Sequence, residues 1–279
     1  MLHIVATPIG NLGDISHRAV ETLRAVDLVA AEDTRRCRAL LSHLGISRPL
    51  VSYHEHSDGR REEKLLRELG HGKQVALVAD AGTPLVSDPG YRLVRAAREA
   101  GIRVSCVPGP CAAIAALSVA GLPTDRFVFE GFLPARESAR RSRLEALLRE
   151  PRTMVFYESP RRVLALFEDL LAVFGGSREA VLARELTKLH ETVLHDGLAR
   201  LRDRIAADAE QQLGEIVVLV HGAPSADSPQ PIDAAQLLAP LLARLPLREA
   251  VDCAAEISGQ PRNALYREAL ALRGRGTGD

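Results

Sequence analysis

The chain has 279 residues, balances 36 basic against 36 acidic side chains, and is 46% apolar. At ~150 residues per domain this length predicts two domains and a small appendage, and the neutral balance excludes a long-range attraction to polyanions. No apolar run approaches the ~20 residues that cross a bilayer, and we find neither an export signal nor a paired-cysteine pattern. We therefore expect a cytoplasmic protein with reduced thiols and no membrane partner.

The first 120 residues alternate short β-branched runs with amphipathic patterns, which is typical of a parallel sheet with crossover helices. The expected strands are residues 2–6, 27–31, 50–53, 74–79 and 102–107. The expected helices are residues 16–25, 34–44, 60–69, 90–100 and 111–120. Residues 1–121 are accordingly predicted to form an N-terminal α/β domain.

A second α/β pattern follows the helix-breaking residues 121–124 (GLPT) and defines a predicted domain over residues 122–222. Its expected strands are residues 126–132, 153–157, 179–185, 191–194 and 215–221, and its helices are residues 138–149, 160–174 and 197–209. Two consecutive strands near its end predict a mixed sheet. Residues 223–279 are predicted to hold a proline-rich linker, a small C-terminal helical domain and a disordered tail.

Three glycine- and proline-rich loops follow predicted strands of the first sheet, at residues 6–14, 80–90 and 107–113. The second of these is longer than the ~2–6 residues that a plain connection needs. Because the carboxyl ends of parallel strands share one edge of a sheet, the three loops predict a ligand site there. The spacing of their glycines disfavours both a Rossmann dinucleotide site and a P-loop.

Charged clusters also follow the predicted strands. In residues 31–36 (AEDTRR), a helix cap formed by Asp33 or Thr34 is as good an interpretation as a functional site. Residues 53–56 (YHEH) lack a third ligand at a fixed spacing, so we expect no metal. Residues 136–152 carry six arginines and three glutamates, which is more often a solvated helix face than a phosphate contact. Residues 156–162 (FYESPRR) and 184–188 (RELTK) fit salt-bridged surface turns as well as they fit functional sites.

These motifs together resemble a known family. Residues 5–12 (VATPIGNL), 31–35, 80–90, 107–112 and 156–162 are similar to the ribosomal RNA small subunit methyltransferase I family, within the tetrapyrrole methylase superfamily. The similarity runs from about residue 2 to residue 221, and residues 263–266 (NALY) resemble that family's small helical domain. Ala79 and Val86 stand where serine and isoleucine are expected, and both departures are mild.

The resemblance implies a class III methyltransferase with two α/β domains, S-adenosylmethionine in the cleft between them, and a homodimer. It implies 2′-O-methylation of a cytidine in the decoding region of 16S rRNA, within the small ribosomal subunit. Carried over residue by residue, the expected cofactor-binding residues are Thr7, Pro8, Gly10, Asp80, Ala81, Gly82, Thr83, Pro84, Ser87, Pro108, Gly109, Pro110, Cys111, Phe132, Tyr157, Arg184 and Glu215.

Methyl transfer from a sulfonium needs alignment of the acceptor oxygen more than it needs proton transfer. We hypothesise that Asp33 or His54 accepts the hydroxyl proton, because both end strands on the predicted cofactor edge. The expected substrate-binding residues are Glu32, Thr34, Arg35, Arg140, Arg141, Arg143, Arg161 and Arg162. The alternatives are a tetrapyrrole C-methyltransferase, which shares the cofactor cleft, and a non-catalytic ribosome-assembly factor of the same fold.

Overall fold

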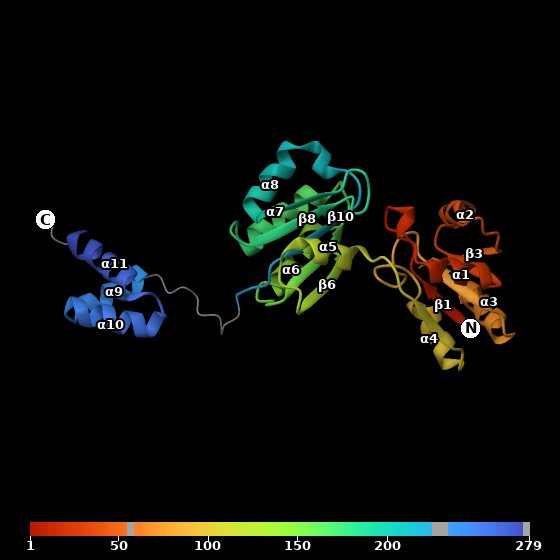
Figure 1. The fold of residues 1–279 in the computed structure, drawn as a ribbon, viewed down its shortest axis with the longest axis horizontal. Coiled ribbons are helices and arrows are strands. Elements are labelled where there is room, and N and C mark those ends of the chain that lie inside the picture. Colours follow the sequence, from red (N-terminus) through yellow and green to blue (C-terminus); the bar gives the residue numbers. More distant parts are fainter. Residues whose placement is uncertain (55–58, 225–233, 276–279) are drawn as a thin grey trace. The chain divides into compact units, whose positions relative to one another are not determined.

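The computed structural model describes residues 1–54, 59–224 and 234–275. The chain divides into two units, Met1–Ala223 and Pro224–Asp279. The first unit contains two sheets and the helices that cover them, and the described part of the second unit contains helices alone (Figure 1). Glu55 and His56 of the predicted His-x-His pair, most of the predicted linker and the last four residues of the predicted tail lie outside the described residues.

The first sheet is entirely parallel and has the strand order β3-β2-β4-β1-β5. Its strands confirm the predicted ones with shorter ends: β1 (Leu2–Val5), β2 (Leu28–Ala31), β3 (Leu50–Ser52), β4 (Val75–Val78) and β5 (Val104–Val107). Every residue of β4 is buried, because helices cover both faces of the sheet. Helices α1 (His17–Ala25) and α2 (Thr34–His43) pack on one face, and α3 (Gly59–Gly70) and α4 (Tyr91–Glu99) pack on the other.

The second sheet is mixed, as predicted, and has the order β6-β7-β10-β8-β9. Strands β6 and β7 are parallel, while β10 is antiparallel to both β7 and β8, and β8 is antiparallel to β9. The bounds are β6 (Phe127–Phe132), β7 (Thr153–Glu158), β8 (Glu179–Arg184), β9 (Thr192–Gly197) and β10 (Ile216–Val220).

Alternate residues of these strands enter two separate cores, because successive strand side chains point to opposite faces. Met154 and Phe156 pack against α6 (Glu137–Ala146), α7 (Val163–Phe174) and α8 (Leu198–Ala207). On the other face, Val155 and Val217 pack against α5 (Ala112–Ala120). Helix α5 precedes the predicted domain boundary at residue 121, yet it covers the second sheet. Short 3₁₀ turns, η1 (Leu12–Asp14) and η2 (Ala209–Gln212), complete this unit.

The second unit is a bundle of three helices, α9 (Ala234–Leu242), α10 (Leu247–Ser258) and α11 (Arg262–Arg275), drawn in blue in Figure 1. Its core is made of Leu238, Val251, Ala254, Leu265 and Ala269. The bundle confirms the predicted small C-terminal helical domain, although α11 ends at Arg275, inside the tail from Gly274 onward that we expected to be disordered. In the part of the chain that the structure describes, no helix is both long and apolar enough to cross a membrane.

Candidate functional site

A cavity of about 400 Å³ opens between the loops of the first sheet and the strand ends of the second. This volume lies within the ~300–1,000 Å³ range typical of small-molecule sites. The residues that line it come from the β4–α4 loop, the start of α5, and the ends of β7, β8 and β10. Of the predicted cofactor residues, those that line it are Asp80, Ala81, Gly82, Thr83, Ser87, Cys111, Phe132, Tyr157 and Glu215.

The three predicted loops converge at this cavity through direct hydrogen bonds. Thr7 and Gly82 exchange backbone hydrogen bonds of 2.9 and 3.1 Å, and the buried hydroxyl of Thr7 donates to the carbonyl of Ala79 at 3.3 Å. The hydroxyl of Thr83 donates to the carbonyl of Pro110 at 2.8 Å. The first loop and the α5 loop are therefore both fastened to the β4–α4 loop.

Eight predicted cofactor residues are not among the described lining residues, and several of them support the loops instead. They are Thr7, Pro8, Gly10, Pro84, Pro108, Gly109, Pro110 and Arg184. Gly109 lies so close to Ala6 that an added Cβ would be 3.0 Å from the Ala6 Cβ. The buried Arg184 guanidinium donates to the Thr192 hydroxyl at 3.2 Å. The cofactor role of these residues stays a prediction.

Glu185 holds the backbone of the second-sheet wall. Its Oε1 accepts hydrogen bonds of 2.8 Å from the Glu215 N–H and from the Lys188 ammonium. Its own φ is 53°, in the left-handed region that non-glycine residues rarely adopt. Gly214 makes this arrangement possible, because an added Cβ would meet the Glu185 carboxylate. Residues 214 and 215 are thereby fixed against the cavity.

The lining of the cavity is acidic. Four acidic residues line it, Asp80, Asp88, Glu158 and Glu215, and among the described lining residues the only arginine or lysine is Arg36. Arg36 pairs with Asp80 at 3.4 Å. The Glu158 side chain is buried, and its Oε1 accepts from the Ser159 N–H at 2.6 Å and from Arg162 Nε at 2.8 Å. Its Oε2 has no partner among the described residues. This acidic lining favours a cationic ligand with hydrogen-bond donors.

The predicted catalytic residues, Asp33 and His54, are not among the described residues that line this cavity. Asp33 caps α2: its Oδ1 accepts from the Arg35 N–H at 2.8 Å, which confirms the helix-cap interpretation. Its hydrogen bonds to the Arg35 side chain hold the pKa of the Asp33 carboxyl at about 2. The Asp33 N–H donates to Asp80 Oδ1 at 2.9 Å. His54 follows β3, and Arg61 lies 3.1 Å from its Nε2. Their catalytic role stays a prediction.

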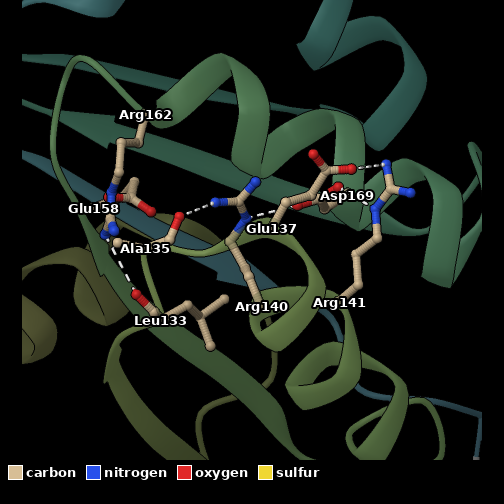
Figure 2. Close-up of polar contacts among 8 residues, drawn as sticks. All are labelled: Leu133, Ala135, Glu137, Arg140, Arg141, Glu158, Arg162 and Asp169. Atoms are coloured by element: carbon tan, nitrogen blue, oxygen red, sulfur yellow. Dashed lines mark hydrogen bonds and ion pairs between the residues drawn. The ribbon is translucent and has the colours of Figure 1, made fainter.

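The basic segment over α6 is partly turned inward (Figure 2). Arg140 is only 5% exposed, and its Nε donates to Asp169 Oδ2 at 2.6 Å. Arg141 is half exposed and donates to the other oxygen of the same carboxylate at 2.5 Å. The structure thus places Arg140 in the interior, which leaves no exposed guanidinium at this position for a substrate phosphate.

The remaining predicted substrate arginines differ in their partners. Arg143 makes a two-pronged pair with Glu130, both hydrogen bonds being 2.9 Å long. Arg162 bonds to the buried Glu158 and donates to the carbonyl of Leu133 at 3.4 Å (Figure 2). Arg161 is exposed, and no hydrogen bond or ion pair connects its side chain to the described residues. Glu32, Thr34 and Arg35 lie at the start of α2, next to Asp33.

Sequence reasoning gave no individual role to Asp88 or Glu158, although both stand in motifs that it singled out. Glu158 ends a strand and Asp88 lies in a predicted ligand loop, and these positions could have marked both as site residues. It also missed the apolar wall of the cavity, where Ala183, Leu186 and Val217 carry no polar feature that marks them. Among the described residues, no group of three histidine, cysteine or acidic side chains is arranged to hold a metal.

Comparisons with known proteins agree with this geometry. The model of the tetrapyrrole (corrin/porphyrin) methylases matches residues 1–202, and that of the RsmI C-terminal HTH domain matches residues 228–273. The crystal structure of the methyltransferase CobJ has a TM-score of 0.60 at 21% identity, covering 80% of this chain and 94% of its own. Diphthine synthase has a TM-score of 0.59 at 17% identity, covering 79% and 89%. Fold and family model together define a methyltransferase of the tetrapyrrole methylase class.

Closer relatives narrow this class. A protein of Pseudomonas aeruginosa named ribosomal RNA small subunit methyltransferase I is 54% identical over 276 residues, covering 98% of each chain. The protein of that name from Escherichia coli O157:H7 is 53% identical over 273 residues, covering 98% of this chain and 96% of its own. The chain therefore belongs to the ribosomal RNA small subunit methyltransferase I family. It is an enzyme, a methyltransferase.

Proposed function

We propose that the protein transfers the methyl group of S-adenosylmethionine to the ribose 2′-hydroxyl of a cytidine in the decoding region of 16S rRNA. The observation that carries this proposal is the convergence of the family's motif loops on one acidic cavity. The names of relatives at 53–54% identity support small-subunit ribosomal RNA as the substrate. The cytidine and the 2′-oxygen come from the resemblance of the motifs.

The residues of the cavity suit the chemistry of this cofactor. S-adenosylmethionine supplies a methyl group on a positively charged sulfur and carries a second positive charge on its ammonium group. Asp80 and Glu158 offer carboxylates that stabilise such charges. Ile9, Leu186 and Val217 offer an apolar wall for a planar base. The partnerless Oε2 of Glu158 would accept a hydrogen bond from a donor group of the cofactor.

The arginines that remain exposed are the proposed contacts to the RNA backbone. Arg161 has no partner among the described residues, and its guanidinium is free to bind a phosphate. Arg141 and Arg143 are about half exposed despite their ion pairs, so each can take part in a shared contact. Since phosphate contacts position an RNA without reading its sequence, these side chains set the orientation of the substrate.

We further propose that the protein acts as a homodimer on the assembled small ribosomal subunit, in the cytoplasm. The homodimer is supported by the resemblance and by the apolar side chains that α5 leaves exposed, Ile114 and Val119. The proposed target nucleotide belongs to the decoding region, which lies in a folded particle. We therefore propose the assembled subunit as the substrate.

The proposed function is tested by transfer of labelled methyl from S-adenosylmethionine to small subunits that lack the modification. Nuclease digestion and mass spectrometry of the nucleosides then identify the product. We expect 2′-O-methylcytidine at one position, while subunits that already carry the modification accept no label. No incorporation, with cofactor binding intact, would exclude this substrate and leave the tetrapyrrole methyltransferase and assembly-factor alternatives.

A further inference from the structure

Asp88 occupies a distinctive place in the cavity wall. It lies in the β4–α4 loop, directly after Ser87, whose φ is 63°. Leu85 in the same loop has a φ of 73°. Two non-glycine residues in the left-handed region within three positions mark a loop whose conformation the surrounding structure imposes. Strand β6 comes close to this loop at Gly131, where an added Cβ would lie 2.8 Å from the Ser87 hydroxyl.

The groups that face Asp88 make its carboxyl a proton acceptor at neutral pH. Burial, followed by the negative charges of Glu32 and Asp80, raises the pKa of Asp88 to about 7. Tyr157 also lies within electrostatic reach, and the pKa of its hydroxyl is raised, chiefly by burial, so it stays neutral. Arg36 lines the same cavity but pairs with Asp80. No hydrogen-bond donor among the described residues contributes to the pKa of Asp88.

The alternative acceptor Asp33 has the opposite environment. Its two oxygens are both engaged by the Arg35 side chain, at 3.2 and 2.9 Å, and this pairing holds its pKa at about 2. The carboxylate of such a strong acid is a weak base, and it takes a proton from a hydroxyl group less readily than a carboxylate whose pKa lies near the working pH. Geometry and electrostatics therefore favour the cavity-lining residue.

We propose that Asp88 is the general base of the methyl transfer and takes the proton of the ribose 2′-hydroxyl. This inference rests on the proposed function. As the hydroxyl oxygen forms its bond to the methyl carbon, the electron pair of the broken carbon–sulfur bond goes to sulfur. The oxygen–hydrogen bond breaks, and its proton goes to an oxygen of the Asp88 carboxylate. Charge is balanced, because a sulfonium and a carboxylate become a neutral thioether and a neutral acid.

The test compares Asp88→Asn with Asp33→Asn and with Asp203→Asn, a matched control at an exposed aspartate of α8. Single-turnover methyl transfer to small subunits is measured from pH ~5 to ~9. A general base contributes ~10²–10⁴-fold to a rate, and we expect the transfer rate of Asp88→Asn to fall by a factor of this size. The ionisation near neutral pH should also be missing from its profile of rate against pH. Asp203→Asn should match the parent protein.

Two readouts separate proton transfer from cofactor binding. The affinity for S-adenosylhomocysteine is measured by calorimetry. We expect the affinity of Asp88→Asn to lie within ~3-fold of that of the parent protein, which is a small difference in binding free energy. Carbon-13 NMR of protein with labelled aspartate should show one carboxyl that titrates near pH 7 and is missing from Asp88→Asn. Unchanged transfer by Asp88→Asn, or an affinity loss as large as the rate loss, would overturn the role of Asp88. A parent protein that binds S-adenosylhomocysteine yet methylates no subunit would instead refute the proposed function, and the role of Asp88 with it.

Discussion

The backbone N–H of Ala113 donates a hydrogen bond to the phenolic oxygen of Tyr157 at 3.1 Å. Ala113 lies in the first turn of α5, where backbone N–H groups have no partner within the helix. Tyr157 is held in place by edge-on contacts with Phe129 and Phe132, at ring-centroid distances of 4.9 and 5.7 Å. One hydroxyl thus joins the α5 loop to the β7 side of the cavity.

Replacing Tyr157 by phenylalanine should leave the Ala113 N–H without its acceptor. An unsatisfied buried donor costs ~1–3 kcal/mol, so we expect the free energy of unfolding in urea to fall by that amount. S-adenosylhomocysteine affinity should fall as well, because the α5 loop lines the cavity. Tyr91→Phe, at an exposed tyrosine, serves as the control and should change stability by less than ~0.5 kcal/mol. Equal effects of the two variants would contradict the role of the Tyr157 hydroxyl.

Gly214→Ala should damage the wall that Glu185 holds. Both Gly214 and Gly121 have a positive φ, of 80° and 69°, but only at Gly214 does an added Cβ meet the Glu185 carboxylate. Gly121→Ala should cost only the ~1–2 kcal/mol of an alanine in left-handed backbone. Gly214→Ala should cost more and should also weaken S-adenosylhomocysteine binding in calorimetry. The idea fails if the two variants bind equally well.

Asp169→Ala should be strongly destabilising. It removes the buried partner of Arg140 and leaves that guanidinium charged in the interior (Figure 2). Breaking a buried pair in this way costs ~3–5 kcal/mol, measured as the free energy of unfolding in denaturant. Arg141→Ala removes the half-exposed partner of the same carboxylate and should cost far less stability, because solvent screens an exposed ion pair. A small effect of Asp169→Ala would show that Arg140 finds another partner or water.

Asp88 should make stability fall as pH rises. The unfolded chain loses the Asp88 proton around its ordinary pKa of 3.8, whereas the folded protein keeps it to about pH 7. Between these values the folded state binds more protons, so its stability decreases with rising pH. The Tm advantage of Asp88→Asn over the parent protein should therefore grow across this window and level off above it. An advantage that does not change with pH would argue against a raised pKa.

Arg161→Ala should weaken binding of small-subunit RNA without changing its sequence preference. Removing one true phosphate contact lowers the slope of log affinity against log salt by about 1. Binding is followed by filter retention or fluorescence anisotropy over a salt series. Arg103→Ala, at an exposed arginine before β5 and opposite the carboxyl edge, should keep the parent slope. An unchanged slope for Arg161→Ala would remove that residue from the RNA contact.

Local patterns predicted most of the fold. Period and turn residues located the strands to within a few residues, and the placement of glycine-rich loops after β1, β4 and β5 predicted their convergence, since parallel strands share one edge. The order β3-β2-β4-β1-β5 could not be read from the sequence, because pairing between strands depends on packing of distant segments.

The site was less predictable for the same reason. The cap that Asp33 forms on α2 is a local motif, and the sequence offered it as one of two equal interpretations of residues 31–36. The burial of Arg140 depends on Asp169, which lies 29 residues further along the chain. The raised pKa of Asp88 comes first from burial and then from the charges of Glu32 and Asp80, and both the burial and the approach of Glu32 arise only in the tertiary fold. Charge runs read along one helix therefore overestimate how many arginines face solvent.

Strand β10 is the last strand in sequence, yet it lies in the middle of its sheet, between β7 and β8. During synthesis, β8 and β9 can pair as a local hairpin, but β7 and β8 remain unjoined until residues 216–220 emerge. A nascent chain that stops short of β10 exposes two unpaired strand edges, which are prone to aggregation. The fold makes completion of the cavity one of the final events in the biosynthesis of the first unit.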